Sequence, residues 1–265
     1  MPSLNVGNIR EGPAQECVEE TMAFTSWRGV VGTIKPNIGT GPTEELIRIL
    51  PDGIGLLPLA LDLPQERGAA RLKAGRIGYD RKIGELAELG ADLALPEGSA
   101  LFMKPGPKAE AKMVGAWEKK HKIPVVTQGM GLRAALRTMK IKHIIGIRPN
   151  TWADGLDYTA NYFAEDGFDV LSFVSPEGYD LASVHDTDPK DVYRTAKQAW
   201  LKNPRADAIV IIAQVMQVGS IIQTIEDDLG IPVISALGTR SWAIQKHLHV
   251  RQPISGYGRL LRELP

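Results

Sequence analysis

The clearest hydrophobic pattern lies in the last third of the chain. The apolar run Ile209–Ile212 predicts a strand buried on both faces, because β-branched residues follow one another without polar alternation. Apolar residues then recur at helical spacing from Val218 to Leu229, and Gly230 supplies a helix stop. The next apolar run, Ile231–Ile234, predicts another strand. This order forms a parallel βαβ unit, which carries chemical groups at the carboxyl end of its first strand.

The same unit occurs a second time, 108 residues earlier (Ile123 against Ile231). Ile123–Val126 has the sequence Ile-Pro-Val-Val and Ile231–Ile234 has Ile-Pro-Val-Ile, and a helical pattern follows each run. Another buried strand, Ala91–Leu95, precedes the first copy. We therefore expect two related halves whose strand ends face each other across a cleft. Chance similarity between two generic α/β units is the alternative.

The rest of the chain continues this alternation of strands and helices. Asp188 and Pro189 predict a helix start, with an acidic N-cap and a proline at the first helical position. The charged, glycine-bearing residues 65–76 predict a loop or a short helix over the cleft. Further strands are expected at residues 30–34, 54–61, 144–147 and 169–173, and further helices at 43–50, 83–89, 132–139, 158–163 and around 113–117.

Composition narrows the classes of function. The chain has 265 residues, 43% of them hydrophobic, and a formal net charge of zero, so it can bury a large core and shows no basic stripe for nucleic acid. No apolar run is long enough for a membrane span, and the first twenty residues are too polar for a signal peptide. We expect a cytoplasmic protein with no nucleic-acid or membrane partner.

The sequence offers no support for a metal or a cofactor. Cys17 is the only cysteine, which excludes an internal disulfide, and we expect it to be an incidental free thiol. The five histidines lack metal-ligand spacing. The glycines after the first strand, Gly39 and Gly41, do not form a dinucleotide-binding or phosphate-binding loop. The residues themselves therefore give little support for nucleotide binding and none for a metal site.

Short motifs from residue 30 to the C-terminus resemble, in their order and spacing, those of one known family. They are Gly32-Thr33-Ile34-Lys35-Pro36, Gly98-Ser99, Arg148-Pro149-Asn150, Asp207–Ala213, Ile231-Pro232-Val233-Ile234-Ser235, Trp242 and Gly256-Tyr257-Gly258-Arg259-Leu260. With them the chain resembles the arylmalonate decarboxylase and maleate cis-trans isomerase branch of the aspartate/glutamate racemase superfamily.

The resemblance implies an α/β fold of two pseudo-symmetric, flavodoxin-like parallel-sheet domains with the active site in the cleft between them. It also implies cofactor-free chemistry and a substrate carboxylate held by loop amides and hydroxyls. We expect residues 1–27 to form an N-terminal extension, residues 28–128 plus 235–265 the first domain, and residues 129–234 the second.

The chain departs from this family at the residues that carry the chemistry. Family members place a cysteine at the end of one or both symmetry-related strands, as acid, base or nucleophile. The matching positions in this sequence are Gly98 and Ala213. A decarboxylase needs only the second cysteine, and a racemase or isomerase usually needs both. Cysteine-dependent isomerisation therefore does not carry over directly.

The carboxylate-binding part of the site is retained in the sequence. Ser99 matches a family position where a small hydroxyl residue binds carboxylate, although a helix cap is the alternative. Asn150 stands where the family commonly has a tyrosine that binds substrate, and its alternative is an ordinary turn residue. Backbone amides at Gly98, Ser99, Gln214 and Val215 are positioned to surround an enediolate-like charge.

An acid or base must replace the thiols. Glu97 is the first candidate, because a buried carboxyl at a strand end is suited to proton transfer; an exposed or ion-paired loop glutamate is the alternative. His185, before a helix, is a candidate proton shuttle, and Gln214 is expected to line the pocket as a third catalytic candidate. Lys35 and Arg148 end strands that converge on the cleft, where they are suited to bind carboxylate, with surface solvation as the alternative. The expected substrate-binding residues are Lys35, Pro36, Asn37, Gly98, Ser99, Arg148, Asn150, Ala213, Val215 and Ser235.

These residues predict a cofactor-independent enzyme that acts on a small mono- or dicarboxylic acid through an enolate-like intermediate. A decarboxylase-type lyase is favoured, because decarboxylation needs one proton donor rather than a nucleophile or a matched pair. The alternatives are a maleate-type cis-trans isomerase or racemase, a cysteine-independent hydrolase or lyase, and a catalytically silent carboxylate-binding protein. The expected partner is a small carboxylate, and a homo-oligomer is possible.

Overall fold

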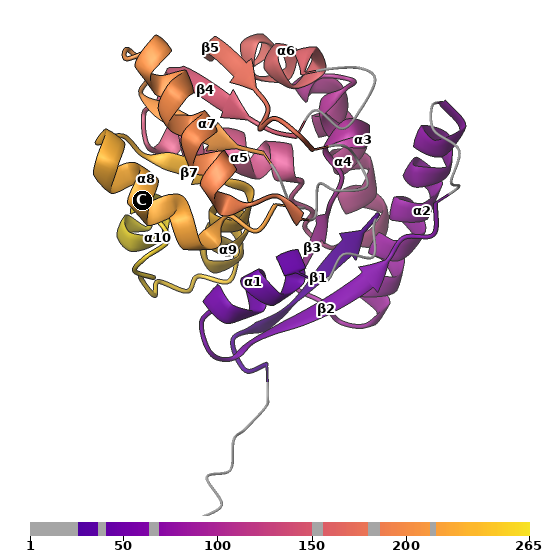
Figure 1. The fold of residues 1–265 in the computed structure, drawn as a ribbon. Coiled ribbons are helices and arrows are strands. Elements are labelled where there is room, and N and C mark those ends of the chain that lie inside the picture. The colour runs from indigo at the N-terminus through magenta and orange to yellow at the C-terminus, as the bar shows by residue number, and fades with distance from the viewer. Residues whose placement is uncertain (1–25, 37–40, 64–68, 150–155, 180–185, 213–215) are drawn as a thin grey trace, which may run out of the picture.

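The computed structural model describes residues 26–36, 41–63, 69–149, 156–179, 186–212 and 216–265. Two parallel β-sheets, each flanked by helices, make up the molecule (Figure 1). The predicted α/β class with two parallel sheets is therefore confirmed. Among the described residues, no helix is both long and apolar enough to cross a membrane.

The first sheet has the strand order β2-β1-β3. Beside β3, Ala94 N donates to Pro124 O (2.9 Å) and Val126 N donates to Ala94 O (3.0 Å), so residues 124–126 extend the sheet as a short fourth strand. The strands of the first sheet and the helices between and after them are β1 (Gly29–Lys35), α1 (Gly41–Ile49), β2 (Ile54–Ala60), α2 (Ala69–Glu88), β3 (Leu93–Pro96), α3 (Ser99–Met103) and α4 (Pro107–His121).

The second sheet has the strand order β5-β4-β6-β7, which repeats the order of the first. Its elements are α5 (Gln128–Thr138), β4 (His143–Ile147), α6 (Asp157–Glu165), β5 (Asp169–Val174), α7 (Pro189–Lys202), β6 (Ala208–Ile211), the 3-10 helix η2 (Gly219–Ile221), α8 (Ile222–Leu229), β7 (Val233–Ser235), α9 (Ala236–His247) and α10 (Arg259–Glu263). Asp188 caps α7 by accepting from Lys190 N at 2.8 Å, as the sequence predicts.

Equivalent hydrogen bonds relate the two halves. The carboxylate of Glu118 accepts from Val125 N at 3.0 Å, and that of Glu226, 108 residues later, accepts from Val233 N at 2.7 Å. The helices that carry these glutamates end in the left-handed region, α4 at Lys122 with φ 59° and α8 at Gly230 with φ 72°. The structure therefore confirms the repeat read from the Ile-Pro-Val runs.

The two halves exchange helices and share one hydrophobic core. Helix α5 follows the fourth strand of the first sheet but packs against β7 of the second, and α9 follows β7 but packs against α1 of the first. The largest apolar cluster accordingly joins Leu93 of the first sheet to Ile234 of the second, with Leu132 and Trp242 from the exchanged helices. The predicted domain boundaries within this arrangement stay a prediction.

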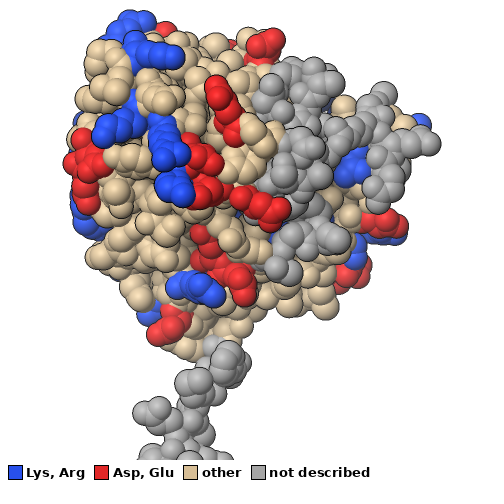
Figure 2. Space-filling model, viewed as in Figure 1, with Lys and Arg blue, Asp and Glu red and all other residues tan. Residues whose placement is uncertain are grey.

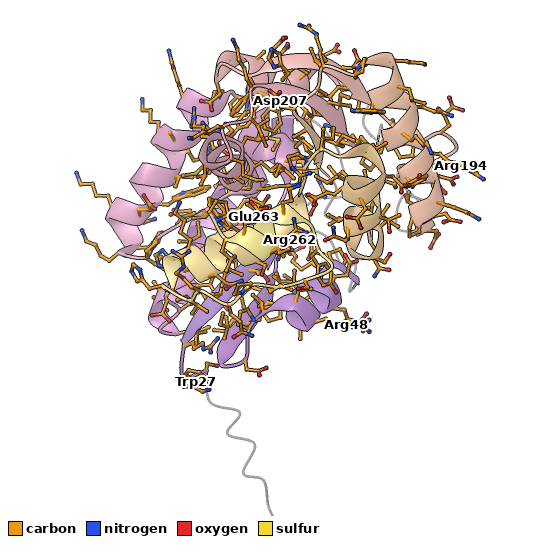
Figure 3. All side chains as sticks on the ribbon, turned by 90° about the vertical axis from the view of Figure 1, so that its left-hand side faces the viewer. Trp27, Arg48, Arg194, Asp207, Arg262 and Glu263 are labelled. Atoms are coloured by element: carbon orange, nitrogen blue, oxygen red, sulfur yellow. The ribbon has the colours of Figure 1, made fainter. Side chains whose placement is uncertain are left out.

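The carboxyl ends of both sheets point toward the middle of the molecule. Trp27, just before β1, and Asp207, just before β6, lie at opposite ends of the view in Figure 3. Because parallel strands all run the same way within a sheet, the strand exits of the two sheets face one another between these ends (Figures 1 and 3).

The region after β2 corrects one prediction. The sequence predicts a loop or short helix for residues 65–76. Residues 65–68 lie outside the described residues, but from Ala69 the chain forms the twenty-residue helix α2. Glycines lower helix propensity here, yet packing decides the outcome. Tyr79, Ile83 and Leu86 of α2 are buried on the first sheet. Close approach explains Gly78, because a Cβ there would lie 2.6 Å from Leu61 Cδ1.

Candidate active site

Two opposite charges lie side by side where the first sheet ends. Ile34 of β1 pairs with Pro96 of β3, and Glu97 N donates to Ile34 O at 2.9 Å, so Lys35 and Glu97 are the next lateral neighbours. Neighbours in register project to the same face of a parallel sheet. Both side chains are buried, with residue exposures of 7% for Lys35 and 2% for Glu97. The sequence predicted both residues as strand-end site residues.

A third charge comes from the other half of the molecule. Arg240 of α9 places Nη2 2.7 Å from Glu97 Oε1, with both side chains almost fully buried. The two groups form an ion pair without the alignment of a hydrogen bond. Lys35, Glu97 and Arg240 are hereafter the charged cluster. Of the two interpretations of Glu97, the structure shows the ion-paired one, in a buried rather than an exposed setting.

Helix α1 and burial define the state of Lys35. Its Nζ donates to Thr43 Oγ1 at 2.7 Å. Burial lowers the pKa of the Lys35 ammonium below its ordinary value; the Glu97 carboxylate opposes this effect and the Arg240 guanidinium adds to it. Burial disfavours the charged form of a lysine. Lys35 is thus a buried cation that gives up its proton more readily than a surface lysine.

The repeat provides an internal comparison for the charged cluster. Ile212 N donates to Ile147 O at 2.8 Å, just as Glu97 N donates to Ile34 O, so Ile212 is the equivalent of Glu97. Leu132 is the equivalent of Arg240, since each is the fifth residue after a capping hydroxyl residue. Both equivalents are buried apolar residues of the shared core.

The fold therefore does not need charges at these positions. A buried ion pair loses hydration energy, and apolar residues of similar volume are often equally or more stable. At the exit of β6 in the second sheet this position holds two apolar side chains, whereas at the exit of β3 in the first sheet it holds an ion pair. This asymmetry favours a chemical role for the charged cluster over a purely structural role.

Arg148 occupies the position equivalent to Lys35. Each residue stands between an isoleucine and a proline at the end of a central strand. Arg148 Nη1 donates to Thr159 Oγ1 of α6 at 2.8 Å, and the guanidinium lies 4.7 Å from the ring centroid of Tyr158. Both cations are thus buried and bound to a hydroxyl of the following helix, and surface solvation is wrong for both.

A small cavity adjoins the charged cluster. Its volume is ≈ 10 Å³, about what one water molecule needs. Within the described part of the chain, five buried polar atoms of its lining residues have no hydrogen-bond partner, namely Glu97 Oε1, Gln128 Nε2, Thr239 Oγ1, Arg240 Nε and Arg240 Nη2. The site thus carries more buried polar groups than its own contacts satisfy.

Gly98 has a conformation that excludes most side chains. Its φ is 112°, and a Cβ there would lie 2.8 Å from Tyr79 Oη and 3.3 Å from Pro36 Cγ. The Tyr79 hydroxyl donates to the main-chain carbonyl of Glu97, and burial raises the pKa of that hydroxyl. Ser99 is the first residue of α3, whose N-cap is Gly98, so Ser99 is not the helix cap.

The exit of β6 lies against the start of α1. Gly219 N donates to Glu45 Oε1 at 3.1 Å across the two halves. The side chain of Gln217 lies against Gly41, where an added Cβ would be 1.8 Å from Gln217 Nε2. Strand exits of both sheets therefore meet on the side of the molecule that carries the charged cluster.

The described part of the chain brings together Lys35, Pro36, Glu97 and Gly98. Ser235 caps α9 by accepting from Gly238 N at 3.0 Å, and its predicted substrate contact stays a prediction. Several expected residues lie outside the described residues, namely Cys17, Asn37, Asn150, His185, Ala213, Gln214 and Val215. No group of three or more metal-ligating side chains occurs in the ranges described above.

Sequence reasoning missed Arg240 and the polar lining of the cavity. The available signal is the run Thr239-Arg240-Ser241 inside a helix whose first ten residues are all buried. A charged residue in a helix buried on every side requires a partner. Only the fold shows that this partner is Glu97, which lies 143 positions earlier (240 minus 97).

The face shown in Figure 2 has no patch of one charge among its described residues. Lysine and arginine side chains are interspersed there with aspartate and glutamate. The fold and the charged cluster together define a pseudo-symmetric, two-sheet α/β protein with a group of buried charges at the strand exits of the first sheet.

Comparisons with known proteins identify the family. The arylmalonate decarboxylase family model matches residues 76–261. A maleate isomerase of Geobacillus stearothermophilus is 29% identical over 189 residues, which cover 69% of this chain and 74% of that protein. The chain belongs to the arylmalonate decarboxylase family, and the predicted enzyme class is confirmed at this level.

Solved structures agree with the fold. A crystal structure of arylmalonate decarboxylase has a TM-score of 0.77 at 19% identity and covers 88% of this chain and 99% of its own. The maleate cis-trans isomerase of Nocardia farcinica, solved as a variant with a covalently bound succinylcysteine intermediate, has a TM-score of 0.78 at 20% identity, with coverages of 89% and 98%. The maleate isomerase Iso of Pseudomonas putida S16, solved as a variant with maleate, has a TM-score of 0.77 at 19% identity, with coverages of 88% and 97%.

Proposed function

We propose that this protein is a cofactor-independent lyase that decarboxylates a small dicarboxylic acid of the malonate type through an enolate-like intermediate. The observation that carries the proposal is the charged cluster of Lys35, Glu97 and Arg240, buried at the strand exits in a chain of the arylmalonate decarboxylase family. The symmetry-related half shows that the fold is satisfied by apolar residues there.

Buried cations suit a dicarboxylate substrate. Lys35 and Arg148 end the central strands of the two facing sheets, and both are buried. Charge-assisted hydrogen bonds from such groups hold a carboxylate, and they strengthen where water is excluded. Neutral donors, including the backbone amide of Gly98, complete the binding of the developing negative charge.

The reaction balances without a cofactor. The bond between the α-carbon and one carboxylate breaks, CO₂ leaves, and the electron pair stays on the α-carbon, delocalised into the remaining carboxylate. A single proton donor then converts this carbanion into the product. Electrostatic stabilisation of the enediolate and one proton transfer are therefore sufficient.

Maleate-type isomerisation is the second candidate, because the Geobacillus stearothermophilus relative is a maleate isomerase. The Nocardia farcinica structure carries a covalent succinylcysteine. Cys17 is the only cysteine of this chain, and it precedes the region that the family model matches. Glu97 and Ile212 are equivalent in register, and in the sequence Gly98 and Ala213 are the residues that follow them. A route through a strand-end thiol is accordingly less suited to this chain than decarboxylation.

The test is a substrate panel with the full-length protein. Aryl- and alkylmalonates, maleate and small lactones are each incubated with it, and products are followed by ¹³C NMR. Release of CO₂ from a malonate supports the proposal. Fumarate from maleate would establish the isomerase instead, and ring opening would establish a hydrolase.

A binding-only protein is distinguished by isotope exchange. If a malonate binds but neither loses CO₂ nor exchanges its α-hydrogen with D₂O, the decarboxylase proposal is wrong. The matched control is the double variant Glu97→Ile with Arg240→Leu, which reproduces the apolar residues of the second half. It should fold and release no CO₂.

A further inference from the structure

We propose that Lys35 is the proton donor of this reaction and that its ammonium protonates the α-carbon of the carbanion left by CO₂. This inference rests on the proposed function. The inference assigns protonation of the carbanion to an amine. The described strand exits offer no thiol for this step, since Cys17 is the sole cysteine of the chain.

The position of Lys35 carries the inference. Lys35 is the last residue of β1, at the exit of a central strand of the parallel sheet. Val31 is buried in the core shared with α9, and side chains alternate along a strand, so Thr33 and Lys35 share that face. This face meets Thr43 of α1 and Arg240 of α9. The ammonium thus lies between the two halves and not in bulk solvent.

The repeat separates charge from proton transfer. Arg148, the equivalent of Lys35, also supplies a buried positive charge bound to a threonine hydroxyl. A guanidinium stays protonated at every accessible pH, whereas an ammonium can give up a proton when its surroundings favour the amine. Of the two equivalent cations, only Lys35 can act as an acid.

The neighbours of Lys35 tune it for this step. Burial lowers the pKa of its ammonium, Arg240 lowers it further, and Glu97 opposes both. Of the other elements packed around it, α1 contributes the hydroxyl of Thr43, which accepts from Lys35 Nζ. A general acid works best when its pKa approaches the operating pH, and a lowered lysine pKa moves toward that of a thiol.

The remaining charges of the cluster are unsuited to donate. Arg240 keeps its proton for the reason given for Arg148. Glu97 is held against Arg240 in a buried ion pair, so its carboxylate is committed to that contact. Their role is to position and tune Lys35. After the transfer, Lys35 is a neutral amine, and a proton from water restores the ammonium before the next turnover.

The test compares Lys35→Arg with Lys35→Met. If Lys35 donates the proton, Lys35→Arg keeps the charge and the substrate affinity to within about threefold but loses about 10²- to 10⁴-fold in kcat, the usual contribution of a general acid. Lys35→Met loses both affinity and kcat. If Lys35 only binds carboxylate, Lys35→Arg retains most of its kcat, and the inference is wrong. Lys202→Met, an exposed lysine of α7, controls for the loss of a lysine elsewhere.

Chemical rescue provides a readout that a structural role would not change. In Lys35→Ala, added methylammonium should restore part of kcat, with a pH dependence that follows the added amine. Circular dichroism and a thermal melt confirm that each variant is folded. A folded Lys35→Ala that no amine rescues, together with an active Lys35→Arg, overturns the donor role.

The outcomes distinguish the two proposals. Wild-type protein that releases no CO₂ from any malonate ends both. If wild type and Lys35→Arg release CO₂ at the same rate, the inference about Lys35 is wrong and the proposed function stands. A wild-type rate that falls as the pH rises through the lowered pKa of Lys35, with no such limb in Lys35→Arg, supports both.

Discussion

The Glu97 carboxylate and the Arg240 guanidinium, 2.7 Å apart, form a buried ion pair between the two halves of the molecule. Their equivalents in the repeat, Ile212 and Leu132, are buried and uncharged. The same backbone arrangement therefore accommodates either an ion pair or two apolar side chains. Substituting both residues of the ion pair should convert the first arrangement into the second.

Removing one member of this pair should be more harmful than removing both. Arg240→Leu leaves a buried carboxylate unpaired and is expected to destabilise the fold by about 3–5 kcal/mol. Glu97→Ile combined with Arg240→Leu is expected to lie between no change and about 4 kcal/mol more stable, with turnover abolished. Urea unfolding of the single and double variants measures both. A double variant as unstable as Arg240→Leu would contradict this account.

Thr43 should affect the pH dependence of the reaction. Thr43→Val removes the hydroxyl that accepts from Lys35 Nζ, and a hydrogen bond to a charged group contributes about 1.5–3 kcal/mol. Without this acceptor the ammonium is less favoured, so the pKa of Lys35 falls further below its ordinary value of 10.5. The protonated form is the active one, so the rate should decline at a lower pH than in wild type.

Thr159→Val is the matched control for this prediction. Thr159 holds Arg148 as Thr43 holds Lys35. Arg148 stays charged throughout, so its loss of a hydroxyl partner should change stability but not the alkaline limb of the rate profile. An equal shift in both variants would show that the limb does not report on Lys35.

Gly98→Ala should be destabilising for two separable reasons. A φ of 112° disfavours any side chain, and the new Cβ would meet the Tyr79 hydroxyl at 2.8 Å. We expect a loss of about 1–3 kcal/mol in the free energy of unfolding. Gly90→Ala is the control, since its φ is 76° but nothing lies within 4 Å of an added Cβ. Gly98→Ala should lose more free energy of unfolding than Gly90→Ala, and adding Tyr79→Phe should recover part of this difference. If nothing is recovered, the whole loss comes from the backbone conformation and none from the contact with the hydroxyl.

Glu45 should make the stability of the protein dependent on pH. Burial raises the pKa of its carboxyl, and Gly219 N and Arg48 oppose this effect. A raised carboxyl pKa means that the folded state binds the proton more tightly than the unfolded state. Stability from this group is therefore fully present below pH 4.5, the ordinary pKa of a glutamate carboxyl, and is lost as the pH rises through the folded pKa.

Unfolding curves of Glu45→Gln and wild type between about pH 4 and 7 measure this effect. The advantage of wild type should shrink as the pH rises. Glu44→Gln is the control, because it removes a charge from the same turn without contact to Gly219. Any dependence of the free energy of unfolding on pH that both variants share is subtracted. An advantage of wild type that grows with pH would contradict the assignment.

The sequence allowed the fold to be predicted where local patterns and packing agree. The Ile-Pro-Val runs and the glycine at 230 predicted the repeat because strand and helix periodicities are local properties. The sequence did not predict the start of helix α2, because its Gly78 is explained only by close approach to Leu61, a contact between segments that the local pattern does not show. The site was predicted in part: Lys35 and Glu97 stand at strand ends, which sequence reveals, whereas Arg240 enters from a helix of the opposite half.

The exchange of α5 and α9 bears on how such a chain can arise. A single copy of the repeated unit would leave the inner face of its sheet bare and cover it only by intertwining with a second copy. Such a dimer would present two identical reaction centres. Once both copies lie in one polypeptide, each can change on its own, and here the exit of β3 carries the Glu97–Arg240 ion pair while the equivalent exit of β6 carries Ile212 and Leu132.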